Sequence, residues 1–95
     1  MPGVDDRLAL HKALMLADRG DPAGAERTLR ALLDGAPAGT VRVQALVVLG
    51  DLLAEHDAAA AREVLTEALA ADLPDADDVL DDERARAREL LDLLG

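Results

Sequence analysis

Few side chains in this sequence are suited to covalent chemistry. Ser, Cys and Tyr are absent, so the candidate nucleophiles are three threonines and one lysine, namely Thr28, Thr40, Thr66 and Lys12. Such groups need an adjacent base to become reactive, and none of the four belongs to a recognisable nucleophile–base motif in the sequence. Thr40 stands at the expected start of a helix, where its hydroxyl would act as a cap. We therefore expect no catalytic residues and no enzyme activity.

The histidines and acidic residues also do not form a metal-binding pattern. His11 and His56 share no His-Glu-x-x-His-like spacing, so we expect a helix-surface residue and a solvated turn residue. An acidic cluster suggests calcium at first sight; it comprises Asp72, Asp75, Asp77, Asp78, Asp81 and Asp82. A calcium loop that begins at Asp75 would need Gly in place of Leu80 and Glu in place of Arg86. Acids at a helix N-terminus favour the helix dipole, so we expect neither a metal nor a cofactor.

Charge and composition exclude several classes of partner. The 95 residues include 10 Lys and Arg but 20 Asp and Glu, with a net charge of −10 and no aromatic residue. This charge opposes contact with phosphates, and no ring can stack on a base. The sequence therefore predicts no binding to nucleic acid or to anionic membranes.

The location is predicted from features that the sequence lacks. The apolar run at residues 45–49, which no other run in the sequence exceeds, is far below the roughly 20 residues of a membrane span. The N-terminus has neither the basic start nor the apolar stretch of a signal peptide, and the absence of Cys favours a reducing compartment. We expect a cytoplasmic protein. The preference for Arg over Lys resembles the usage of GC-rich genomes.

The elements that carry these residues are predicted to be helices only. Ala and Leu are abundant, and Phe, Tyr, Trp and Ile are absent, which favours helices over strands. Gly20-Asp21-Pro22 ends one helix and begins the next, His56-Asp57 repeats this signal, and Asp5 or Asp6 and Thr40 are further candidate caps. We expect five helices, at about residues 6–19, 22–34, 41–55, 58–71 and 78–94.

The apolar pattern predicts which helices are buried. The third helix is apolar on every side, and the first helix is apolar almost all round, with Leu8, Ala9, Leu10, Ala13, Leu14, Met15, Leu16 and Ala17. A helix of this kind must be buried on most sides. We expect the third helix to be central, and the second, fourth and fifth helices to bury one stripe each.

A repeat relates the two halves of the chain. Placing Asp21 over Asp57, at an offset of 36 residues, aligns Ala25 with Ala61 and Leu29 with Leu65. A helix-pair period in the mid-thirties is typical of a stacked solenoid.

On these residues the sequence resembles the tetratricopeptide repeat (TPR). The signature positions are Ala13, Leu16, Gly20-Asp21, Ala25, Leu29, Leu32 and Pro37 in one copy, and Leu49-Gly50, Ala61, Leu65, Ala68-Leu69 and Pro74 in the other. Leu stands where the family has aromatic residues. The resemblance implies an all-α single domain over 1–95, made of five antiparallel helices: two TPR-like hairpins, at about 6–37 and 40–74, and a C-terminal capping helix at about 78–94. A generic bundle of helical hairpins is the alternative.

The resemblance also implies a binding groove, because the first helix of each TPR pair lines a concave face. The groove would be lined by Arg7, Leu10, His11, Leu14, Asp18, Val47, Asp51, Ala54 and Glu55. The family's clamp for a C-terminal carboxylate uses Lys and Asn at this face. This chain has no Asn and its one Lys lies off the face, so that specificity is not expected. An apolar helix or peptide with basic flanks would suit the groove.

The predicted function is that of a non-catalytic adaptor or regulator, which binds an unidentified protein partner or a second copy of itself. We expect a homodimer, because two hairpins and one cap without aromatic bulk leave apolar side chains uncovered. The alternative is a structural accessory or cap domain of a larger assembly, in which the final helix fills the groove and closes a five-helix bundle.

Overall fold

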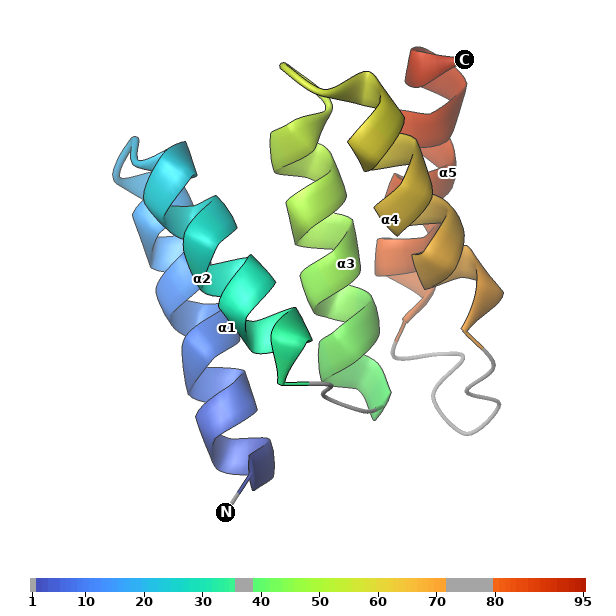
Figure 1. The fold of residues 1–95 in the computed structure, drawn as a ribbon. Coiled ribbons are helices and arrows are strands. Elements are labelled where there is room, and N and C mark those ends of the chain that lie inside the picture. The colour runs from blue at the N-terminus through green and yellow to red at the C-terminus, as the bar shows by residue number, and fades with distance from the viewer. Residues whose placement is uncertain (1, 36–38, 72–79) are drawn as a thin grey trace.

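A computed structural model describes residues 2–35, 39–71 and 80–95, with side chains described from Asp5 onward. These residues form five α-helices and no strand, which confirms the all-α prediction (Figure 1). The helices are α1 (Pro2–Asp18), α2 (Pro22–Asp34), α3 (Gly39–Leu53), α4 (Ala58–Ala70) and α5 (Asp81–Leu94).

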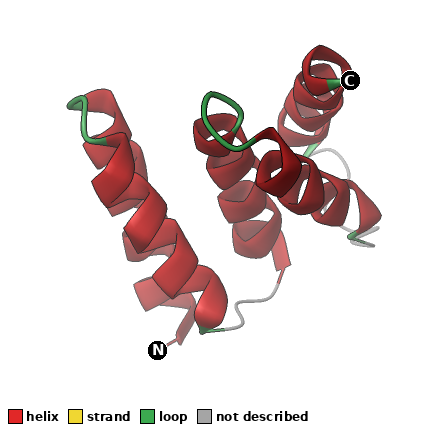
Figure 2. Cartoon of the chain, turned by 45° about the horizontal axis from the view of Figure 1, so that its top comes forward, coloured by secondary structure: helices red, strands yellow, loops and turns green. Residues whose placement is uncertain are grey.

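Successive helices run antiparallel, so α1, α3 and α5 point one way and α2 and α4 the other (Figure 1). Helix α3 contacts all four other helices, while α1 packs on α2 and α3, and α5 packs on α4 and α3. Helix α3 therefore lies between α1 and α5 in the succession of contacts. Helix α2 packs on both α1 and α3, and α4 packs on both α3 and α5. Figure 2 shows the same succession from a second direction.

The repeated start signals act as the sequence predicts. The Asp21 carboxylate accepts a hydrogen bond from the Gly24 backbone N–H at 3.0 Å, and Asp57 accepts one from Ala60 at 3.2 Å. Each bond satisfies an N–H that has no partner within the first turn of its helix. Gly20, with φ of +84°, makes the left-handed turn that ends α1.

Three helix boundaries differ from those expected. Helix α1 begins at Pro2, whose missing N–H costs nothing in the first turn, so Asp5 lies within the helix and neither Asp5 nor Asp6 is a cap. Helix α3 begins one residue before Thr40, at Gly39, which enters the helix with φ of +70°. At the other end of α3, Leu53 is the last helical residue, because its carbonyl accepts two turn hydrogen bonds, from the backbone of residues 56 and 57.

The other boundaries lie close to the prediction. Helices α2 and α4 match within one residue. Helix α5 is described from Asp81, so its predicted start at Asp78 lies outside the described residues. Leu80, at the N-cap position, has no side-chain cap bond.

The core is centred on α3, as predicted. Eight of its residues are buried: Val41, Val43, Ala45, Leu46, Val47, Leu49, Gly50 and Leu53. Each of the outer helices α2, α4 and α5 buries the predicted single stripe against α3 or a neighbour; these stripes contain Ala25, Leu29 and Leu32, then Ala61, Leu65 and Ala68, then Ala87 and Leu90. Leu80 is also fully buried.

The predicted burial of the first helix is wrong. Among the described side chains of α1 only Leu10 and Ala13 are buried. Leu8 is 61% exposed, and Leu14 and Met15 are each 41% exposed. The reason lies in the order of packing: α1 is the first element of the stack, so its neighbours, α2 and α3, cover one side of it.

Candidate functional site

A groove lies between α1, α3 and α5. Its volume is about 370 Å³, which falls at the lower end of the range of ligand-binding clefts. The apolar lining residues are Leu14, Ala17, Val47, Val48 and Leu52, and the charged ones are Asp18, Asp51, Asp82, Glu83 and Arg86. The groove therefore has an apolar floor and a mainly acidic rim.

Four of the nine residues predicted to line a groove do so: Leu14, Asp18, Val47 and Asp51. They come from α1 and α3, the first helices of the two predicted repeats, and the tertiary structure brings them together.

The other five predicted residues lie elsewhere. Arg7 and His11 are exposed on α1, and Leu10 is buried in the core. Ala54 and Glu55 follow the end of α3 and belong to the α3–α4 turn. None of the five lines the groove. Ala54 and Glu55 miss the groove because α3 ends at Leu53. Their predicted direction assumed that the helix continues through them.

Helix α5 supplies a wall of the groove through residues that were not among the predicted lining; the sequence offered a final helix at the groove only as an alternative in which it fills the groove. Asp82, Glu83 and Arg86 line the groove from α5, which packs on α3 and α4. The acids at the start of this helix are visible in the sequence, where they were assigned to the helix dipole. Nothing in their local pattern indicates that α5 lies along α3, since that depends on the packing of helices far apart in the chain.

Several acidic groups of the groove lack a counterion. Arg86 pairs with Asp51, at 3.1 Å, and with Glu89, at 3.3 Å. Within the described part of the chain, Asp18 and Asp82 form no ion pair.

Glu83 has one carboxylate oxygen without a donor. Its Oε1 accepts a hydrogen bond from Gln44 Nε2 at 3.4 Å, whereas Oε2 is buried and has no hydrogen-bond partner. A buried acceptor without a donor costs free energy. Because this oxygen is enclosed within the fold, Glu83 adds negative charge to the groove wall without offering that oxygen to a ligand.

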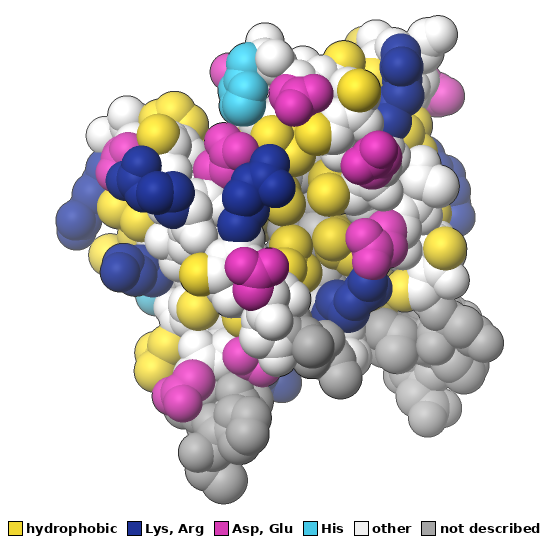
Figure 3. All heavy atoms as spheres, viewed as in Figure 1, with side chains coloured by type: hydrophobic (Ala, Val, Ile, Leu, Met, Phe, Trp, Pro, Cys, Tyr) yellow, Lys and Arg dark blue, Asp and Glu magenta, His cyan; other side chains and the backbone are white. Residues whose placement is uncertain are grey.

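A second hollow, between α2, α3 and α4, differs in its charges. Its lining includes Arg30, Arg42 and Glu67 around Leu46 and Val64. Arg42 pairs with Glu67, and Arg30 pairs with Glu26 at 3.1 Å. Figure 3 shows one face of the molecule, on which hydrophobic side chains lie between acidic and basic ones. The arginines of this hollow are already paired, and among the described residues Asp34 is its one acid without an ion pair, so it has less to offer a charged partner than the groove.

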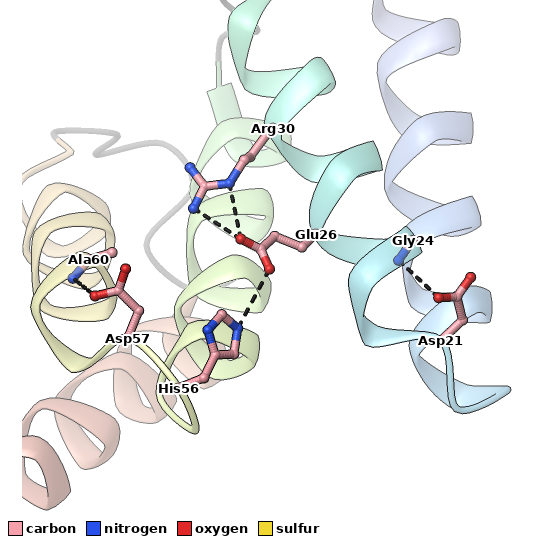
Figure 4. A network of polar contacts seen from close by, with 7 residues as sticks. All are labelled: Asp21, Gly24, Glu26, Arg30, His56, Asp57 and Ala60. Atoms are coloured by element: carbon pink, nitrogen blue, oxygen red, sulfur yellow. Dashed lines mark hydrogen bonds and ion pairs between the residues drawn. The ribbon is translucent and has the colours of Figure 1, made fainter.

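The two hairpins are linked by a polar contact that the sequence did not predict. Glu26, on α2, points between Arg30 and His56, the latter from the α3–α4 turn (Figure 4). The His56 Nε2 lies 3.5 Å from Glu26 Oε2. His56 is exposed, as expected of a turn residue. This contact joins the half-buried Glu26 of the first hairpin to the exposed His56 that precedes α4, and we assign it a structural role.

The described residues contain no cluster of three or more His, Cys, Asp or Glu side chains placed to hold a metal ion. Of the acidic run predicted to favour a helix dipole, Asp81 and Asp82 lie in the first turn of α5, and the members from Asp72 to Asp78 lie outside the described residues. His11 is exposed on α1. None of the helices in the described ranges is both long enough and apolar enough to cross a membrane.

Comparisons of the chain with protein-family models, with curated proteins and with solved structures give no match. The resemblance to tetratricopeptide repeats therefore rests on the residues and spacing of this sequence.

Proposed function

We propose that the chain is a non-catalytic, TPR-like protein-interaction module, which binds an amphipathic helical segment with basic residues in the groove between α1, α3 and α5. The observation that carries the proposal is an apolar floor beside acidic groups that lack counterions. Helix-in-groove recognition places the apolar face of a helix on such a floor.

The order in which the helices pack supports the proposal of a TPR-like repeat. Asp21 and Asp57 cap α2 and α4 in the same way. Each hairpin packs on the next element, so that the first helices of successive pairs, α1 and α3, contact each other and α5 follows. A stack of this kind has one surface formed by the first helices, and the groove lies there.

The charge of the partner follows from the rim. Asp18 and Asp82 face no described counterion, and Glu83 adds a third negative charge to the groove wall. Lys or Arg side chains flanking an apolar helix would pair with these acids. Such rim contacts increase the rate of association and its specificity more than the final affinity.

The proposal is tested by capture from a native lysate of the source cells. The groove variant is Asp18→Lys/Asp82→Lys, which changes two exposed residues and leaves the core intact. The matched control is Glu63→Lys/Asp92→Lys, which makes the same change of charge at exposed positions outside the groove lining. Circular dichroism establishes that all variants keep their helices.

We expect the wild-type chain and the control to retain the same basic partner, and the groove variant to lose it. Equal capture by all three chains, or a wild type that captures no specific partner and also does not associate with itself, would contradict the proposed function. The second outcome would favour a structural element of a larger assembly.

A further inference from the structure

One exposed face of α1 has the chemistry that the groove requires. Leu8, Lys12, Met15 and Arg19 are spaced i, i+4, i+7 and i+11, so they share one side of the helix. All four are exposed. The Arg19 N–H donates to the Met15 carbonyl at 3.1 Å, so the last turn extends to this residue. We call these four residues the α1 stripe.

The α1 stripe is exposed along its whole length in the part of the chain that the structure describes. At 100° per residue it points away from Leu10 and Ala13, the two buried residues of α1. Its apolar members are 61% and 41% exposed. In the described part of the chain neither Lys12 nor Arg19 forms an ion pair. The stripe therefore alternates two exposed apolar side chains with two unpaired cations, on the outside of an end helix.

We propose that the occupant of the groove is the α1 stripe of a second copy of this chain, an inference that rests on the proposed function of the groove. Unpaired cations and exposed apolar side chains on one surface match unpaired acids and an apolar floor on another. A dimer would bring Lys12 and Arg19 of each copy to the acids Asp18, Asp82 and Glu83 of the other.

The position of α1 allows both contacts to form at once. Helix α1 carries the stripe and also one wall of the groove, through Leu14 and Asp18. When two α1 helices lie side by side about a two-fold axis, each stripe faces the other copy's groove. Such a contact is self-complementary and closed, as in most homodimers. Both exposed apolar surfaces are then covered.

The net charge of −10 on each chain opposes association at long range. At physiological salt this repulsion is screened beyond about 8 Å. The pairs between stripe and groove act at contact distance, where opposite charges favour the correct orientation.

The test uses two charge-reversal variants and their mixture. The stripe variant is Lys12→Glu/Arg19→Glu, and the groove variant is Asp18→Lys/Asp82→Lys. In each variant alone, like charges meet at both contacts of the dimer. In an equal mixture, the reversed stripe meets the reversed groove, and the unchanged stripe meets the unchanged groove. Sedimentation equilibrium over a range of concentrations gives the masses.

We expect the wild-type chain to form a reversible dimer of twice its 10.0 kDa mass. Each variant alone should associate at least about tenfold more weakly, and the mixture should recover a heterodimer. The control Glu63→Lys/Asp92→Lys should behave as the wild type does.

Three results would overturn the inference: a wild type that stays monomeric, association that neither variant weakens, or a mixture that fails to recover it. A monomeric wild type that still captures a groove-dependent partner would overturn the dimer and leave the proposed function in place. A dimer that forms as expected, while the lysate yields no other partner, would make self-association the use of this groove.

Discussion

Helices α1 and α3 have similar apolar patterns but different surroundings. Both have apolar side chains on nearly every side. Eight residues of α3 are buried, whereas among the described side chains of α1 only Leu10 and Ala13 are. The difference is one of position. Helix α3 has two helices before it and two after it in the chain, and it contacts all four, whereas α1 is the first helix and packs on α2 and α3. Apolar content therefore shows that a helix has several surfaces to cover without showing what covers them.

The comparison also separates stability from binding. In α3 the apolar side chains contact one another and their neighbours, so their burial stabilises the fold. In α1 the exposed side chains contribute little to the monomer and remain available for contact with another molecule. Three substitutions test this division, in order of decreasing effect on the free energy of unfolding.

The largest effect is expected in the centre of α3. Leu49 is 1% exposed, so Leu49→Ala should lower the free energy of unfolding by about 2–5 kcal/mol, through lost burial and the cavity left behind. Urea unfolding followed by circular dichroism measures this change. A loss below about 1 kcal/mol would mean that α3 is not the centre of the fold.

A smaller effect is expected at Gly50, where α3 passes close to the Leu65 side chain of α4. A Cβ added at Gly50 would lie 2.5 Å from both Cγ and Cδ2 of Leu65, a side chain that is itself fully buried. Gly50→Ala should therefore destabilise the protein by about 1–3 kcal/mol, although alanine is favoured over glycine within a helix by about 1 kcal/mol.

The control for this prediction is the same change in a Leu65→Ala background, where the clash is removed. There Gly50→Ala should cost less than in the wild type, and the double-mutant cycle gives the coupling between the two sites. Additive effects would show that the close approach does not determine the cost.

The smallest effect is expected on the outer side of α1. Leu8→Ala should change the free energy of unfolding by less than about 0.5 kcal/mol, because Leu8 is 61% exposed and alanine is a good helix former. The measurement is made at low micromolar concentration, where association contributes least. A loss comparable to that of Leu49→Ala would mean that this face of α1 is covered within the monomer.

The sequence was most informative where the determining interactions are local. The caps at Asp21 and Asp57 were predicted correctly, because a cap depends on a side chain and a backbone N–H three residues away. The single stripes of α2, α4 and α5 were also correct, because a helix with one apolar side has one way to bury it. The start of α1 lies earlier than predicted, because Pro2 is tolerated in the first turn of a helix.

The part of the candidate site that the sequence predicted is also the part that depends on local helical geometry. Leu14, Asp18, Val47 and Asp51 line the groove, since helical spacing fixes which residues share a side. Ala54 and Glu55 do not line it, because turn hydrogen bonds end α3 at Leu53.

By itself the sequence determined the five helices, two of their caps and the central place of α3, through spacing and local hydrogen bonding. The tertiary structure alone decided that α5 forms a wall of the groove and that the α1 stripe is exposed. These two outcomes depend on which helices become neighbours, and that choice is made by contacts between residues far apart in the chain. An end helix has fewer neighbours than a central one, so the same apolar pattern builds the core in α3 and an exposed surface in α1.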